Sequence, residues 1–282
     1  QLCVLTVHAH PDDEASKGAP TLAKYHDLGV RTVLVCCTGG EEGDLQNPAL
    51  RNEGGPFHGM TPEEEKQHLV RIRPVELAKS AQIIGFDQVI MLGYRDSGMA
   101  DSPPNENPSC FHQASLDEAV GRLVSIIRRE RPQVIITYGD DQRGYPHPDH
   151  IKVHTVGHRA AELAGTPAVF ESTMNRDAMK RFFDMARDQG EASGPDGEDW
   201  NPDAPADDGN PFGTPESELT HVVDVSAFVA VKRSSIRCHK SQITDAGFFS
   251  NMPDELFAMV FGREWFIRPG AGHALREGWL FE

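Results

Sequence analysis

Short apolar runs alternate with longer amphipathic segments through the first 165 residues of the chain. The apolar runs are rich in β-branched residues, which is typical of buried strands, whereas the segments between them have the pattern of helices. We expect strands at 2–7, 30–37, 89–92, 134–138 and 168–171, and helices at about 16–28, 62–84, 115–130 and 148–164. Because strands and helices alternate in this way in βαβ units, the sequence predicts an α/β fold with a Rossmann-like, mostly parallel sheet flanked by helices.

The pattern is weaker after this core. Residues 188–209 contain eight Asp or Glu, three Pro and no Lys or Arg, and we expect them to form a mobile acidic loop because they have little apolar surface to bury. The other C-terminal segments are an amphipathic stretch at 175–187, a strand at 221–225, a helix at 226–242 and an aromatic-rich tail at 248–267 that packs on the core. We therefore expect one domain, 1–282, in which a core (1–165) is completed by a smaller C-terminal portion (220–282).

The composition excludes several classes of partner. The formal net charge of -16, from 27 basic and 43 acidic residues, argues against nucleic acid and anionic membranes, because phosphate binding needs basic patches. No apolar run approaches the ~18 residues of a membrane-spanning helix, and no secretory signal precedes the first strand, so we expect a cytoplasmic protein. The five cysteines show no C-x-x-C spacing, which favours reduced thiols without a catalytic role.

Two histidines and three carboxylates follow the first predicted strand, in the sequence Val7-His8-Ala9-His10-Pro11-Asp12-Asp13-Glu14. A helix is predicted directly after them, so the cluster lies on a strand-to-helix turn. Ligands of open α/β sheets bind beyond the carboxyl ends of the strands, where such turns lie. His10 and Asp13 can therefore converge on one point while Asp12 faces a neighbouring one. We interpret His8 as a core or supporting histidine.

A second cluster, Gly144-Tyr145-Pro146-His147-Pro148-Asp149-His150, occupies the equivalent position after the strand at 134–138. Two imidazoles and a carboxylate from the two turns would form a zinc site with open positions for water or substrate, and Zn²⁺ lowers the pKa of a bound water to ~7. Either His147 or His150 could be the third ligand. Non-haem Fe(II) oxygenases use the same donors but usually have all-β folds, so a hydrolytic zinc site is favoured.

The remaining polar residues suit hydrolysis of an amide. Adjacent carboxylates cannot point in the same direction, so Asp12 could stay unligated beside Asp13 as a general base, worth ~10²–10⁴ in rate. Tyr145 could donate to a developing oxyanion, and His147, oriented by Asp149, could protonate a leaving amine. The alternative for a single cluster is a helix start capped by a carboxylate; two clusters together disfavour it.

Two further histidines, His154 and His158, lie on the same side of the predicted helix 148–164 as His150. They could extend a metal-binding face. We interpret them instead as an ordinary helix flank.

The two clusters together resemble the LmbE-like, or PIG-L, family of zinc-dependent N-acetylglucosaminyl-inositol and phosphatidylinositol de-N-acetylases, over about residues 2–165. The motifs that carry the resemblance are His10-Pro11-Asp12-Asp13-Glu14 and Tyr145-Pro146-His147-Pro148-Asp149-His150. The resemblance implies one Zn²⁺ per chain, held by His10, Asp13 and His150. It also implies that Asp12 is the base and that Tyr145 and His147 polarise the carbonyl and protonate the amine.

Other details resemble the amidases of mycothiol S-conjugates more than the deacetylases of mycothiol biosynthesis. They are Ser16-Lys17-Gly18, Thr38-Gly39-Gly40-Glu41, Asn47-Pro48-Ala49, Asp96-Ser97-Gly98, Cys110-Phe111 and Gly144-Tyr145-Pro146-His147. This resemblance implies hydrolysis of the amide between glucosaminyl-inositol and the S-substituted N-acetylcysteine of a thiol conjugate, which releases a mercapturate in detoxification. Deacetylation of N-acetylglucosaminyl-inositol is the alternative, and a non-catalytic protein that binds zinc and sugar is a third.

Four residues are expected to contact this sugar-inositol substrate. Lys17 could select a larger acyl group or could be a helix-flank lysine. Arg73 and Asp96 resemble the family's contacts to sugar and inositol hydroxyls, which need charge-assisted hydrogen bonds. An exposed ion pair between Arg73 and Glu76 is the alternative for that arginine. Asp44 stands where relatives often carry Glu. Homo-oligomerisation is left open.

Overall fold

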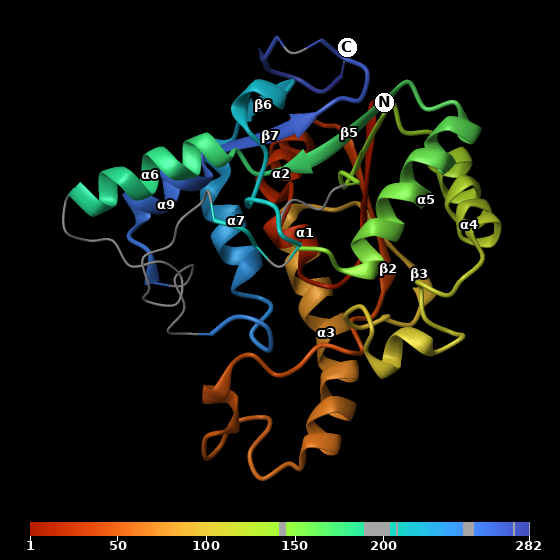
Figure 1. The fold of residues 1–282 in the computed structure, drawn as a ribbon, viewed down its shortest axis with the longest axis vertical. Helices are drawn as coiled ribbons and strands as arrows, with labels where there is room; N and C mark the ends of the chain where they lie inside the picture. The colour runs from red at the N-terminus through yellow and green to blue at the C-terminus, as the bar shows by residue number, and fades with distance from the viewer. Residues whose placement is uncertain (141–144, 189–203, 207, 245–250, 273, 282) are drawn as a thin grey trace.

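A mixed sheet of eight strands runs through the computed structural model, which describes all residues except 141–144, 189–203, 207, 245–250, 273 and 282 (Figure 1). The strands are β1 (Cys3–His8), β2 (Arg31–Thr38), β3 (Gln88–Tyr94), β4 (Val134–Thr137), β5 (Ala168–Thr173), β6 (His221–Asp224), β7 (Arg263–Ile267) and β8 (Arg276–Glu277). Their order is β3-β2-β1-β4-β5-β7-β6-β8. The first five are parallel, whereas β7 pairs antiparallel with both β5 and β6. The predicted α/β fold class is confirmed.

Helices cover both faces of this sheet, with α4 and α5 on one side and α2, α3 and α7 on the other (Figure 1). The α-helices are α1 (Asp13–Ser16), α2 (Ala19–Asp27), α3 (Pro62–Ile84), α4 (Leu116–Glu130), α5 (Pro148–Ala164), α6 (Arg176–Asp188), α7 (Val229–Ile236) and α9 (Asp254–Phe261). Within the described residues, no helix is both long and apolar enough to span a membrane.

The central strand β1 is buried along its whole length because it has a core on each side. Successive side chains of a strand point to opposite faces. Val4 accordingly lies in the cluster that contains Leu22 of α2, whereas Leu5 lies in the cluster that contains Leu123 of α4 and Val153 of α5. Burial of each such side chain is worth roughly 1.5–3 kcal/mol, so both helical layers hold β1 in place.

Local signals explain where the long helix α3 begins and ends. The Thr61 side chain accepts a hydrogen bond from the Glu64 backbone while the Glu64 side chain accepts one from the Thr61 backbone, which is a capping box. The helix ends at Gly85, whose φ of 91° favours glycine. Pro74 lies inside one continuous helix; of the two effects that a proline at this position predicts, a kink or a restart, the restart is wrong.

The structure corrects three predicted elements. The helix expected at 16–28 is two helices, α1 and α2, because Gly18 adopts a φ of 89° between them. The helix expected at 226–242 is shorter: a 3-10 turn at 226–228 precedes α7, which ends at Ile236. The tail packs on the core as expected through Phe257 and Phe266, but it also contains the unpredicted strand β7. Most of the predicted acidic loop lies outside the described residues.

Candidate active site

The two predicted clusters meet because the strands that precede them are neighbours. β1 pairs with β4 in parallel, so the carboxyl ends of both strands lie at the same edge of the sheet. The chain leaves β1 through a short turn into α1, and it reaches α5 after β4. The turn after β1 carries His10, Asp12 and Asp13, and the start of α5 carries Asp149 and His150.

His10, Asp13 and His150 form a buried three-residue cluster. One nitrogen or carboxylate oxygen of each lies within 4.8 Å of the others. Asp13 Oδ2 lies 3.6 Å from His10 Nδ1 and 3.4 Å from His150 Nε2. Of the two candidates for a third ligand, the described residues group His150, and not His147, with His10 and Asp13.

This cluster fits a divalent metal ion. Among the described residues, the buried His150 Nε2 has no hydrogen-bond partner, and burial lowers the pKa of His150 to about 4, so its ring is neutral. Desolvation opposes ionisation of Asp13, but the Lys17 ammonium, 3.0 Å away, and the contact with His10 hold the pKa of Asp13 well below its usual value. A neutral imidazole nitrogen with a free lone pair and an ionised carboxylate are the ligand forms that metals require. The donor set serves both zinc and iron.

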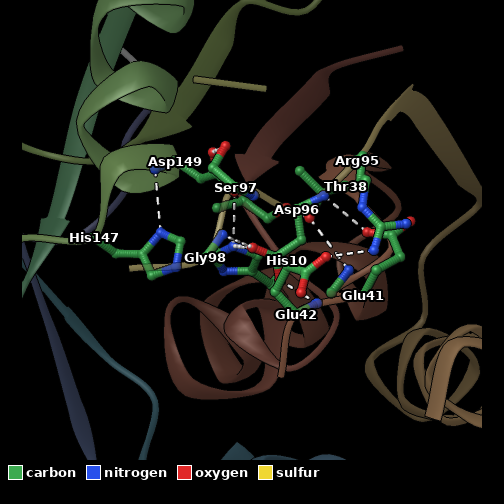
Figure 2. Close-up of polar contacts among 12 residues, drawn as sticks. His10, Thr38, Glu41, Glu42, Arg95, Asp96, Ser97, Gly98, His147 and Asp149 are labelled. Carbon is green, nitrogen blue, oxygen red and sulfur yellow. Dashed lines mark hydrogen bonds and ion pairs between the residues drawn. The ribbon is translucent and has the colours of Figure 1, made fainter. Parts of the chain in front are cut away.

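The Asp149 carboxylate contacts the His10 ring and holds it in position (Figure 2). Its Oδ2 lies 3.2 Å from His10 Nε2 and accepts a hydrogen bond from Ser97 N at 3.0 Å, while Ser97 Oγ donates to its Oδ1. A carboxylate on the second nitrogen of a ligating histidine fixes the orientation of the ring. Asp149 also contacts His147, as predicted, and does so through its backbone N–H, which donates to His147 Nδ1 at 3.1 Å.

Asp12 is the residue before the first turn of α1, but among the described residues its side chain makes no capping hydrogen bond. Its φ is 109°, in the region that side chains rarely adopt, and such strain persists only where surrounding contacts hold it. The backbone N–H of Asp12 donates to Glu14 Oε2 at 2.9 Å, and Asp12 Oδ2 accepts from Arg73 Nη2 at 3.1 Å. Desolvation raises the pKa of the Asp12 carboxyl, whereas Arg73 opposes that shift.

Arg73 is buried beneath this turn. Its side chain therefore does not make the predicted contact with a sugar. Besides Asp12, it donates to the carbonyl of Pro11 at 2.7 Å and to that of Gly40 at 2.6 Å. The alternative of an exposed ion pair with Glu76 is also wrong, since Glu76 is buried and accepts hydrogen bonds from Ser241. Arg73 therefore ties the Asp12 turn to α3.

A buried network missed by the sequence analysis supports the same turn. Glu14 accepts hydrogen bonds from Ser80 of α3 and from His239, whose Nε2 lies 2.7 Å from Glu14 Oε1. These partners are far apart in the sequence and belong to no short motif. The ring of His8, which was interpreted as a core or supporting histidine, is buried and forms hydrogen bonds with Thr6 and Tyr138.

Tyr145 and His147 line the approach to the cluster. Tyr145 is 43% exposed, and its ring centroid lies 5.1 Å from that of His150 and 5.9 Å from that of His147. Desolvation raises the pKa of Tyr145, so its hydroxyl keeps its proton at neutral pH and can donate a hydrogen bond. Because His147 Nδ1 accepts the Asp149 N–H, the proton of a neutral His147 ring lies on Nε2.

The predicted substrate contacts are dispersed. Lys17 lies at the cluster, with Nζ 3.0 Å from Asp13 Oδ1 and 4.8 Å from the centre of the Tyr138 ring. Asp96 is buried, with Oδ1 3.6 Å from His10 Nε2, so it supports His10 and does not face open space (Figure 2). Asp44 is exposed, and its backbone carbonyl accepts from the Gln242 side chain.

A cavity of about 1400 Å³ opens beside the cluster. Lys17, Tyr145 and His150 belong to its lining. The rest of the lining mixes charged or polar residues, such as Glu171, Arg181, Lys232 and Glu264, with apolar ones, among them Met174, Met179, Phe182, Met185, Met259, Phe261 and Trp265.

Comparisons with known proteins agree with the family to which the two motifs pointed, and relatives of this chain are named as deacetylases. The sequence pattern of the GlcNAc-PI de-N-acetylase (PIG-L) family matches residues 5–161. The chain is 37% identical to 1D-myo-inositol 2-acetamido-2-deoxy-alpha-D-glucopyranoside deacetylase of Acidothermus cellulolyticus, covering 94% of this chain and 87% of that protein. It is 35% identical to the deacetylase of the same name from Streptomyces avermitilis, covering 99% and 96%.

The fold also has solved counterparts. A conserved protein of Thermus thermophilus superposes with a TM-score of 0.53 at 22% identity, covering 95% of each chain. At this level of identity the likeness concerns the fold alone.

Proposed function

This chain belongs to the GlcNAc-PI de-N-acetylase (PIG-L) family and is a hydrolase of an amide bond, and from this premise we propose that it removes the N-acyl group of a glucosaminyl-inositol. The observation that carries the proposal is the convergence of His10, Asp13 and His150, with Asp12 beside them. A sugar-binding protein without activity would need neither Asp12 nor its anchor to Arg73.

Deacetylation of N-acetylglucosaminyl-inositol is the first candidate reaction. Two relatives named for this activity share more than a third of their residues with the chain over nearly its whole length. They favour the reaction that the sequence analysis treated as the alternative.

Hydrolysis of a mycothiol S-conjugate is the second candidate, and the cavity favours it. An acetyl group is small, whereas the cavity measures about 1400 Å³ and part of its lining is apolar, including Met179, Phe182 and Trp265. Pockets for drug-sized ligands usually measure about 300–1,000 Å³. The apolar part could accept the S-substituent of a conjugate, with Lys17 near the junction between the sugar and the acyl group.

The proposed mechanism uses the chain's own residues around a metal site. His10, Asp13 and His150 would hold the ion, which when bound supplies Lewis-acid polarisation of the amide and acidifies water. Asp12 accepts the proton of the attacking water and returns it to the leaving amine. Tyr145 donates its hydroxyl hydrogen to the developing oxyanion.

The neighbouring side chains keep these groups in position. His147 offers its Nε2–H as a second donor, because its Nδ1 is occupied by the backbone of Asp149. Arg73 prevents the Asp12 carboxylate from turning away, so a proton acceptor is in place before the substrate binds.

A substrate comparison tests the proposal. We would measure kcat/KM of the metal-loaded protein for N-acetylglucosaminyl-inositol, by acetate release, and for a bimane conjugate of mycothiol, by mercapturate release. Faster acetate release supports the first candidate, and faster mercapturate release supports the second. No turnover of either compound by the wild type at full metal occupancy would refute the proposed function. Asp12→Asn, which keeps the size of the side chain, is the control for background hydrolysis.

A further inference from the structure

A second group of metal-ligating side chains lies further along α5 than His150. His154 and His158 occupy successive turns of α5, and Glu171 reaches them from β5. One ligand atom of each lies within 4.8 Å of the others. Two histidines at i and i+4 on one helix face, completed by a glutamate, form a known type of zinc site. The sequence analysis interpreted both histidines as an ordinary helix flank, and their partner Glu171 comes from a separate strand.

The hydrogen bond of His154 to a backbone carbonyl leaves its second ring nitrogen with a lone pair. Its Nδ1 lies 2.9 Å from the backbone carbonyl of Tyr138 and 3.5 Å from Glu171 Oε1. A carbonyl oxygen only accepts, so Nδ1 carries the ring proton and Nε2 keeps its lone pair. A backbone carbonyl on one nitrogen is the usual partner of a histidine whose other nitrogen binds a metal. The ring centroids of His154 and His158 are 4.4 Å apart.

The contact between His158 and Glu171 favours an ion over a simple hydrogen bond. His158 Nε2 lies 2.9 Å from Glu171 Oε1, yet this buried nitrogen has no hydrogen-bond partner among the residues that the structure describes. A proton stabilises two such atoms when it lies close to the line that joins them. A metal ion lies to one side of that line, ~2.1 Å from each atom. The observed pair therefore has the separation of two ligands without the alignment of a donor and an acceptor.

We propose that His154, His158 and Glu171 form a second binding site for a transition-metal ion such as Zn²⁺, separate from the cluster at His10. The side chains are 22%, 26% and 12% exposed, so an ion can reach them from solvent. Glu171 also lines the cavity that His150 and Tyr145 line. With three protein ligands, the ion keeps open positions for an oxygen-bearing group of a ligand in that cavity. The site does not depend on the reaction proposed above.

Metal stoichiometry tests the second site. Apo protein would be dialysed against buffers of rising free Zn²⁺, and bound zinc would be measured by mass spectrometry beside protein concentration. We expect two equivalents in the wild type, and one in Glu171→Gln and in His158→Ala. His150→Ala should also keep one equivalent, which the double variant His150→Ala/Glu171→Gln should lose. Far-UV circular dichroism would confirm that each variant is folded.

The matched control is Glu162→Gln, which removes an exposed carboxylate from the same helix, where it pairs with Arg159. This variant should keep both equivalents. A single equivalent in the wild type would overturn the proposal and would indicate that the second group is only a histidine–glutamate ion pair. Two equivalents retained by both Glu171→Gln and His158→Ala would overturn it as well.

Discussion

The buried pair of Glu14 and His239 offers the sharpest mutational test of how the candidate catalytic turn is supported. Glu14 and His239 are 0% and 1% exposed at their side chains, and their charged atoms lie 2.7 Å apart. Despite desolvation of both groups, His239 holds the pKa of Glu14 below its usual value, and Glu14 raises that of His239. The opposite shifts indicate that the two are ionised together.

Replacing His239 by Ala leaves the Glu14 carboxylate buried without its cation. Removal of one partner from a buried ion pair costs about 3–5 kcal/mol. For a chain of this size, ~2 °C of melting temperature per kcal/mol predicts a decrease of roughly 6–10 °C. Turnover should also fall, because Glu14 Oε2 accepts the backbone N–H of Asp12, whose φ of 109° needs that support.

The double variant His239→Ala/Glu14→Gln separates the charge from the cavity left by the ring. Because the double variant has no charge at either position, it should regain part of the stability that His239→Ala loses. The amide oxygen at position 14 can still accept the Asp12 N–H. Calorimetry of the metal-loaded variants measures stability, and kcat against KM measures function. If His239→Ala lost less than ~1 kcal/mol, or if the double variant were no more stable than the single one, the ion-pair reasoning would be refuted.

Three further predictions concern other contacts. Asp12→Asn should lower kcat by ~10²–10⁴ while metal content stays at the wild-type level, and an unchanged kcat would remove Asp12 as the base. Asp149→Asn should weaken metal binding at the His10 cluster about 10–100-fold in a competition titration, because the amide orients His10 less firmly; unaltered affinity would contradict that role. Arg31 Nη2 lies 2.7 Å from Glu130 and, although desolvation opposes the shift, lowers the pKa of Glu130 below 4.5. A carboxyl group whose pKa is lower in the folded state stabilises the fold at pH values above 4.5 and loses that contribution as the pH falls. Glu130→Gln should therefore lose less stability on acidification than the wild type does. Equal losses in the two proteins would contradict the assignment.

The parallel half of the fold could be predicted because its signals are local. Apolar runs such as 134–138 and the amphipathic pattern of 115–130 each report one element without reference to the rest of the chain. The strand β7 carries no such signal: its first two residues, Arg263 and Glu264, are charged, and only three apolar residues follow. It forms because β5 and β6 offer free edges on both sides of it.

The candidate site divides in the same way. His10 and His150 follow predicted strands, so the topology of a parallel sheet was sufficient to bring them together. The contacts of Arg73, His239 and Glu171 could not be predicted, because each reaches the site from an element whose packing depends on the completed fold. Arg73 was assigned to the substrate because its charge is visible in the sequence and its burial is not.

These unpredicted contacts assign a role to the C-terminal portion of the chain. The family pattern ends at residue 161 and includes all three candidate metal ligands. Helix α7 and the residues after it nevertheless hold the segment that carries two of those ligands, His10 and Asp13: Lys232 Nζ donates to the carbonyls of Ala15 and Ser16, and His239 pairs with Glu14. Since Asp12 depends on Glu14 for its strained backbone, the family motif alone cannot hold the proposed base in position. The candidate catalytic residues thus follow the two strand ends, whereas C-terminal side chains such as Lys232 and His239 help to hold them in position.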